Sequence, residues 1–256
     1  PFETLNGLII WYQRPIVFPG GLSGLFNSQN YAGSWLNLVW PFCIALIFEK
    51  TKNLYNKSVH TCFLVAIALA IFLTYSRNAW LGLLIAFPLV ITQQAFFWLI
   101  IIFLISASII IFLISPIFTG EIQTIFRELI PNKILLEFSE EGYKNLDVTR
   151  LEILKSAVDI ISTSPLLGIG AASFTAIYEL KTSFYKGHSH NLLTELAISY
   201  GLPVTIIFAL TILSILAISY YAVFFKNSKS IDYFERACWA SVFFFFLSQL
   251  VDIQYF

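Results

Sequence analysis

The sequence lacks methionine altogether and is poor in charge, with only 12% Asp, Glu, Lys and Arg among its 256 residues. Soluble domains carry about a quarter charged residues. With 58% hydrophobic residues and a mean hydropathy of +0.78, the composition indicates a polytopic membrane protein. The formal net charge is zero, so nothing in the composition favours binding of nucleic acid.

Several functional motifs are also missing from the sequence. It has no HExxH element, no phosphate-binding loop, no dinucleotide fingerprint and no acidic pair spaced as in metal sites. The three cysteines, Cys43, Cys62 and Cys238, lie in hydrophobic runs and are interpreted as small core residues rather than a disulfide or metal set. We therefore expect neither a cofactor nor a metal ion.

The hydrophobic runs predict an all-α fold with about six transmembrane helices. A crossing helix needs about 20 mostly apolar residues, with a range of roughly 17 to 25. The predicted spans are 31–48, 59–75, 79–91, 95–118, 202–225 and 237–256. The third is short, and the run Leu5–Tyr12 is predicted to lie at the interface or to end a further helix. Since residue 1 is Pro and the last run reaches residue 256, we expect 1–256 to be a single membrane domain from a longer protein.

Lysine and arginine in short connections predict the orientation of the spans. They occur between the first and second spans and between the fifth and sixth, at Lys50, Lys52, Lys57, Lys226, Lys229 and Arg236. Four spans separate the two connections, so both can be cytoplasmic. The residues before span 31–48, the turn at 76–78 and the long loop 119–190 are then all extracytoplasmic.

The loop 119–190 is far longer than common connections, which favours a functional segment or disorder. Part of it predicts an amphipathic helix, because Leu151, Leu154, Val158 and Ile161 recur at helical spacing. Asp147 or Thr149 can cap its start, and Thr149 with Glu152 matches a capping box. Ser164-Pro165 ends the helix, a turn follows at 168–170, and a polar strip leads on to His188.

Two of the three histidines lie where this loop meets a hydrophobic run, in Gly187-His188-Ser189-His190-Asn191, with Glu195 four residues beyond Asn191. Histidine is the side chain whose ordinary pKa allows proton exchange near neutrality. The segment therefore suggests proton-transfer chemistry at a membrane surface. The alternative interpretation is an ordinary helix start, with Asn191 or Ser189 as its cap.

Two arginines are candidates for binding an anion. Arg77 lies in a turn at the bilayer edge, where it either snorkels to the interface or meets an anion. Arg150 lies in the first turn of the amphipathic helix, where a cation opposes the helix dipole unless an anion such as phosphate binds there. The alternative for Arg150 is an ion pair with Asp147 or Glu152.

Further polar residues lie beside the predicted spans. Asn27, Gln29 and Asn30 precede the first span and either bind a polar ligand or serve as turn and cap residues. Asp252 falls in the last hydrophobic run, and an acid within a span is a functional candidate by default. The sequence does not identify a partner for it.

Three elements in order resemble the O-antigen ligase/polymerase superfamily of bacterial envelope proteins. They are Ser76-Arg77-Asn78-Ala79-Trp80-Leu81-Gly82, the loop element 164–174 (SPLLGIGAASF), and His188-Ser189-His190-Asn191 with Glu195 and Gly201-Leu202-Pro203. The resemblance runs from about Phe26 to the end. Asn78 stands where this family usually has glycine, and Pro203 shifts the glycine pattern at the helix entry.

This resemblance implies a metal-independent membrane glycosyltransferase of the GT-C kind in the bacterial inner (plasma) membrane. It would move a glycan from a polyprenyl-diphosphate carrier to an acceptor hydroxyl on a glycan or lipid, on the extracytoplasmic side. Arg77 and Arg150 would bind the diphosphate, and Asn30 and Asn191 would bind the substrate. His190, or alternatively His188, would act as the base, with Glu195 orienting the imidazole or contacting sugar hydroxyls.

The details look most similar to a cyanobacterial branch described as inorganic-carbon (bicarbonate) transporters, which makes a solute transporter the alternative function. Transporters place polar sites near the bilayer midplane on broken helices. Here the ionisable residues gather instead at the predicted outer surface. The distribution favours chemistry at the interface.

Overall fold

The computed structural model describes residues 21–26, 28–48, 54–92, 94–114, 120, 123–125, 149–226 and 232–253. Leu5–Tyr12 and Asn27 lie outside these residues. Within them the fold contains helices and no strand, as the sequence predicts. The long helices are α2 (Gln29–Phe48), α3 (Leu54–Leu73), α4 (Arg77–Ile91), α5 (Ala95–Ile114), α11 (Leu192–Tyr221) and α12 (Tyr233–Gln249).

Four of these helices, α2, α3, α5 and α11 extended to Phe225, are long and apolar enough to cross a membrane. They correspond to four of the six predicted spans. The other two predicted spans coincide with α4 and α12, which have 15 and 17 residues. The chain is therefore a membrane protein, and the crossing by α4 and α12 stays a prediction.

The last span was predicted to continue to residue 256, and that prediction is wrong. The α12 helix ends at Gln249 and a turn follows at Leu250 and Val251, so Asp252 lies beyond the helix. At its other end α12 starts at Tyr233 and includes Arg236, which was predicted to lie in a connection. The Arg236 side chain is buried, with its guanidinium 4.8 Å from the centroid of the Phe224 ring.

The centre of the bundle is α2, which packs against α3, α4 and α12. Small residues allow this close approach, since a Cβ on Gly33 would lie 2.5 Å from the Cβ of Ala79, and one on Gly82 would lie 2.6 Å from the Asn37 amide. Cys43 is buried in this core, whereas Cys62 and Cys238 are exposed free thiols, contrary to expectation. We call α2, α3, α4, α5 and α12 the bundle.

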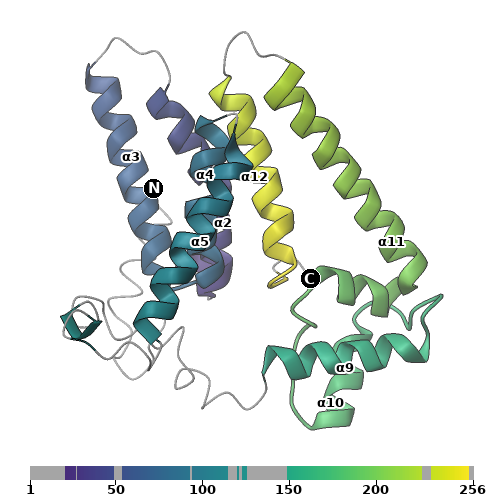
Figure 1. The fold of residues 1–256 in the computed structure, drawn as a ribbon. Helices are drawn as coiled ribbons and strands as arrows, with labels where there is room; N and C mark the ends of the chain where they lie inside the picture. The colour runs from purple at the N-terminus through teal and green to yellow at the C-terminus, as the bar shows by residue number, and fades with distance from the viewer. Residues whose placement is uncertain are drawn as a thin grey trace.

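A second, smaller core lies below one end of the bundle. It joins α9 (Arg150–Thr163), α10 (Ser173–Thr182) and the start of α11 through Ile153, Ala157, Ile160, Phe174, Tyr178 and Ile198. We call α9, α10 and residues 192–200 of α11 the cap unit. Figure 1 shows the cap unit at the end of the bundle where α2 begins and α12 ends.

The predicted amphipathic helix exists as α9, and Thr149 forms the predicted capping box with Glu152. The predicted hydrophobic face is mostly exposed, and only Ile161 of its four residues packs against the second core. Leu151, Leu154 and Val158 are exposed, while the buried side is the one carrying Ile153. The strip leading to His188, predicted as polar loop, contains the additional helix α10.

The α11 helix is broken at Gly201, whose φ of 84° lies in the left-handed region. The loop after α9 fits into this break. Ile169 and Gly170 donate their N–H groups to the carbonyls of Ile198 and Ser199 at 2.7 and 3.1 Å, and Leu202 donates to Pro165 at 2.8 Å. The break thus separates the cap unit from the membrane span at Leu202, where the sequence predicted the span to begin.

Candidate functional site

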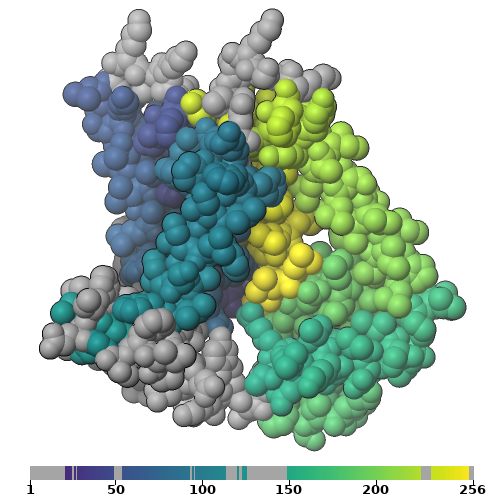
Figure 2. Space-filling model, in the orientation of Figure 1, coloured from purple at the N-terminus to yellow at the C-terminus, as the bar shows by residue number. Residues whose placement is uncertain are grey.

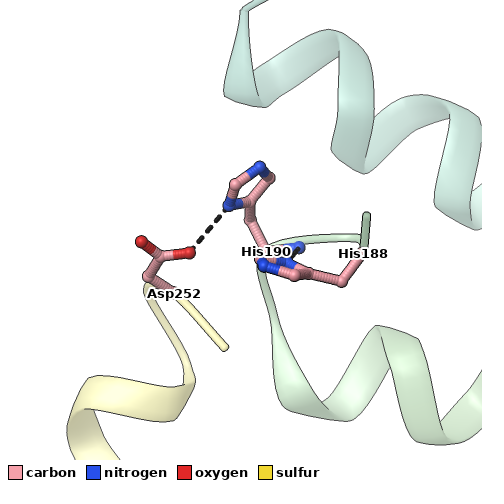
Figure 3. A group of neighbouring side chains, drawn as sticks. All are labelled: His188, His190 and Asp252. Carbon is pink, nitrogen blue, oxygen red and sulfur yellow. Dashed lines mark hydrogen bonds and ion pairs between the residues drawn. The ribbon is translucent and has the colours of Figure 1, made fainter. Parts of the chain in front are cut away.

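The site lies at the end of the bundle that faces the cap unit. It is organised around Asp252, whose side chain is only 7% exposed. His190 Nδ1 lies 2.7 Å from Asp252 Oδ1, a strong hydrogen bond (Figure 3). On the other carboxylate oxygen, Oδ2, Asp252 accepts a hydrogen bond from Asn30 Nδ2 at 2.8 Å and lies 3.8 Å from an Arg150 guanidinium nitrogen.

Asp252 carries a negative charge in this arrangement. Burial acts to raise the pKa of the carboxyl, but the hydrogen bond with His190 and the charges of His190, Arg150 and His188 outweigh burial and lower the pKa. An ionised carboxylate on Nδ1 fixes the tautomer of His190 and leaves the Nε2 side of the ring facing away from Asp252 (Figure 3). This is the geometry of a histidine prepared to accept a proton.

His188 lies against His190, with ring centroids 4.4 Å apart and the rings nearly perpendicular. Its Nδ1 accepts a hydrogen bond from the backbone N–H of His190 at 3.2 Å. Burial and then the neighbouring charge of His190 lower the pKa of His188. His188 is therefore neutral at pH 7, and it holds the backbone of His190.

That backbone adopts an unusual conformation, since His190 has a φ of 58°. A non-glycine residue in the left-handed region costs of order 1 kcal/mol and persists where its surroundings hold it. Here the buried Glu195 side chain accepts the N–H of Ser189 at 2.9 Å, and the Ser189 hydroxyl lies 2.8 Å from that of Thr194. These contacts place the loop on the start of α11.

Asn191 is the N-cap of α11, as one of the two alternatives predicted. Its Oδ1 accepts the N–H groups of Leu193 and Thr194, and its Nδ2 donates to the carbonyl of Leu250 at 2.8 Å. The same side chain thus starts a helix of the cap unit and binds the end of α12. This contact and the hydrogen bond between His190 and Asp252 join the cap unit to the bundle.

The predicted site residues are distributed as follows. His190, Arg150 and Asn30 meet at Asp252, whereas the contacts of Glu195 and Asn191 are with the backbone around them. Among the described residues Arg150 pairs with Asp252 and not with Glu152, which caps α9. Asp147, the other predicted partner, lies outside these residues. Of the amides near the first span, Gln29 accepts the N–H of Gly21, a turn contact.

Arg77 begins α4 and is half-buried. The turn before it packs on α2, because a Cβ on Gly33 would lie 3.3 Å from the Thr74 hydroxyl and 3.4 Å from the Ser76 side chain. Gly33 lies less than one turn from Asn30. Arg77 is therefore at the same end of the bundle as the carboxylate of Asp252.

The sequence did not assign Asp252 its role, although it marked this residue as an acid in a hydrophobic run. The missing information was the end of α12, which brings an acid 62 positions from His190 into contact with it. A stretch of polar residues around 248–254 after a run of phenylalanines was the available signal. This polar stretch is compatible with the end of a helix and equally with a span that contains a buried charge, so the sequence alone could not decide between them.

His188, His190 and Asp252 offer ligand atoms that lie within 4.8 Å of one another, a spacing that suits a metal ion. Two of the lone pairs are already in use. Asp252 Oδ1 is at hydrogen-bond distance from His190 Nδ1, and His188 Nδ1 accepts a backbone N–H. A metal ion on these atoms would displace both hydrogen bonds, so the arrangement favours proton transfer.

Comparison with known proteins identifies the family of the chain. The sequence model of the family described as O-Antigen ligase (Wzy_C) matches residues 62–209, more than half of the 256 residues. The match includes Arg77, Arg150 and the segment His188–Glu195, and it supports the ligase family without indicating the cyanobacterial branch. None of the curated proteins matches the chain. The chain belongs to the O-antigen ligase family.

Proposed function

We propose that the protein is a membrane glycosyltransferase of the O-antigen ligase or polymerase type. It transfers a glycan from a polyprenyl-diphosphate carrier to an acceptor hydroxyl at the extracytoplasmic face of a bacterial inner membrane, without a metal ion. The observation that carries this proposal is the hydrogen bond of 2.7 Å between His190 and a buried carboxylate that Arg150 also approaches. A base and an anion-binding cation thus lie side by side at the end of the bundle.

His190 is the general base of the proposed reaction. Its Nε2 takes the proton of the acceptor hydroxyl, while Asp252 stabilises the imidazolium that forms. The acceptor oxygen bonds to the anomeric carbon of the donor as the bond from that carbon to the diphosphate oxygen breaks. The electron pair leaves with polyprenyl diphosphate, which needs no general acid because a diphosphate is a weak base.

The leaving diphosphate gains negative charge, and fixed cations stabilise it. Arg150 is suited to this because it lies in the first turn of α9, where the helix dipole also favours an anion. Its side chain is 49% exposed, so it can reach a ligand from its place beside Asp252. Arg77, at the start of α4, is the second cation.

The other predicted site residues position this machinery. Glu195 and Asn191 hold the loop that carries His190, and His188 binds the His190 backbone. Asn30 donates to the carboxylate oxygen of Asp252 that His190 does not use, which orients the acid toward the imidazole. Each of these residues acts through a hydrogen bond, so each substitution should affect the reaction through His190.

The test uses the full-length protein in proteoliposomes with a polyprenyl-diphosphate glycan and a panel of acceptors, and it measures release of polyprenyl diphosphate. We expect acceptor-dependent release that falls by about 10²–10⁴-fold in His190→Ala, the usual contribution of a general base. His60→Ala is the matched control, because His60 contacts the Leu46 carbonyl in the bundle. Absence of release from folded wild-type protein with every acceptor, or full activity of His190→Ala, would contradict the proposal.

A further inference from the structure

The loop between α9 and α10 exposes two adjacent leucines. Leu166 is 70% exposed and Leu167 is 84% exposed, and Ile169 beside them is also exposed. No ionisable residue occurs from position 164 to position 174. Single exposed hydrophobic residues are common on protein surfaces, whereas a group of them on one segment marks a surface that meets a partner or a membrane. We call residues 164–170 the tip.

The tip is held tightly against the break in α11. Leu202 donates its N–H to the Pro165 carbonyl at 2.8 Å, and a Cβ on Gly201 would lie 2.3 Å from the Leu166 carbonyl oxygen. Gly168 turns the tip with a φ of 71°, and its own Cβ would meet the α11 backbone at 2.6 Å. Because this fit fixes the backbone, the two leucines stay directed outward and do not fold onto the protein.

This fit places the tip at the boundary of the membrane. From Leu202 to Phe225, α11 and its extension measure about 35 Å at 1.5 Å per residue, against about 30 Å for the hydrocarbon core of a bilayer. Leu202 thus lies where the hydrocarbon meets the headgroups at one face of the membrane, and the tip bonded to it lies at the same level. Figure 1 shows the loop after α9 beside the start of the span, and Figure 2 shows this segment at the edge of the molecular surface.

The hydrophobic surface of the tip continues the lipid-facing surface of the span, whose first turns expose Leu202, Val204 and Ile207. We infer that Leu166 and Leu167 insert into the bilayer at this boundary, where interfacial segments reach about 5–10 Å into the region between headgroups and acyl chains. The partner of the tip is the lipid of the bilayer that α11 itself crosses. The insertion does not depend on the proposed function.

Insertion of the tip fixes the height of the cap unit relative to the bilayer. The tip joins α9 to α10, and its hydrogen bonds end on Ile198 and Ser199 in the first part of α11. His190 lies just before this part of the helix. Contact with the membrane at the tip therefore also sets the level of the histidine, which under the proposed function has to match that of a diphosphate among the headgroups.

Leu180 in α10 provides a matched comparison. It is 86% exposed, as much as Leu167, but it lies between Glu179 and Lys181. Figure 1 shows α10 on the side of α9 that faces away from the membrane spans. A lone hydrophobic side chain between two charges is ordinary protein surface, so we expect Leu180 to lie in water.

The first experiment measures depth in the membrane without turnover. A nitroxide is attached at Leu167→Cys or Leu180→Cys in the full-length protein in proteoliposomes, with Cys62 and Cys238 replaced because they are exposed thiols. Collision with oxygen, which concentrates in lipid, is compared with collision with a water-soluble nickel chelate. We expect the oxygen-to-nickel ratio to be at least about fivefold higher at 167 than at 180, as for a side chain inserted at the boundary. Equal ratios would overturn the inference.

The second experiment tests whether the leucines hold the tip in the membrane. A nitroxide at Ile169→Cys reports the depth of the tip, and Leu167→Asp adds a charge that is costly to place in lipid. We expect Leu167→Asp to lower the oxygen-to-nickel ratio at 169 at least about threefold, and Leu180→Asp to leave it unchanged. A nitroxide at Ile207→Cys, on the exposed side of the span, should keep its ratio in both variants and so verifies the fold. An unchanged ratio at 169 would overturn the inference, whether or not the protein catalyses transfer.

Discussion

The helices α2 and α11 are both long hydrophobic spans, yet they are packed in opposite ways. In α2 50% of the residues of the span are buried within the protein, whereas in the span of α11 only 11% are. Small residues let α2 approach its neighbours closely, and α11 instead stands apart from α12 over a hydrophobic cavity. The difference contrasts the packed centre of the bundle, α2, with helices at its edge, because the spans of α3 and α5 are also only 11% and 6% buried.

The proposed site lies across the junction of these two parts. Asn30 in α2 and Asp252 just after α12 lie on the bundle side, while Arg150 in α9 and His190 just before α11 lie on the side of the cap unit. Polar contacts therefore hold the cap unit against the bundle, because hydrophobic packing between these two parts is weak. Substitutions on the two sides of the junction should therefore distinguish residues that take part in the proposed reaction from residues that hold the two parts together.

The largest effect is expected from Asp252→Asn, on the bundle side. The amide removes the negative charge and presents the wrong partner to His190 Nδ1, so kcat should fall by about 10³–10⁴-fold, as for the acid of a hydrolase triad. The release of polyprenyl diphosphate measures it. Asp159→Asn, on the exposed side of α9, is the control and should retain activity. Near-normal kcat in Asp252→Asn would show that His190 needs no charged partner.

The next effect is expected from Arg150→Lys, on the cap side. A lysine keeps the charge but loses the planar fork that binds a diphosphate at two points, which should lower kcat/KM about 10- to 100-fold. Lys155→Ala, one turn further along α9, should leave the rate unchanged. If the Arg150→Lys protein reacts at the wild-type rate, the proposal that Arg150 binds the diphosphate at two points is wrong.

A smaller effect, on stability, is expected from Gly201→Ala between the cap unit and the span of α11. The added Cβ would lie 2.3 Å from the Leu166 carbonyl oxygen at a φ of 84°, so the free energy of unfolding should fall by about 1–3 kcal/mol. Thermal unfolding in detergent measures the loss. Gly187→Ala has room for its Cβ and should unfold like wild type. Equal stability of both variants would show that the close contact of the loop after α9 with the break at Gly201 does not contribute to stability.

The smallest effect is a pH dependence that comes from His188. Because its pKa is lowered in the folded protein, the unfolded chain binds the proton first as pH falls below about 6.5, and stability is lost from there down through the folded-state pKa. His188→Gln should lose less stability than wild type between pH 7 and pH 5 in thermal unfolding. Parallel curves for the two proteins would exclude this contribution.

Local signals in the sequence predicted the parts of the fold that depend on neighbouring residues. The capping box at Thr149, the Asn191 cap and the start of the span at Leu202 belong to this group. The side of α9 that packs against the protein was not predicted, because Leu151 and Ile153 both lie on apolar sides of the helix and only α10 and α11 decide which of them is buried. The same holds for Asp252, whose partners are all distant in sequence.

The position of Asp252 after α12 also bears on the order in which the protein is made. His190 and Arg150 leave the ribosome before α12 does, so for that interval the base has no acid and the cation has no partner at Oδ2. On the proposed mechanism, a nascent chain in this state lacks the hydrogen bond that prepares His190 to accept a proton. In the proposed mechanism the insertion of α12 is thus the step that brings Asp252 to His190 and Arg150.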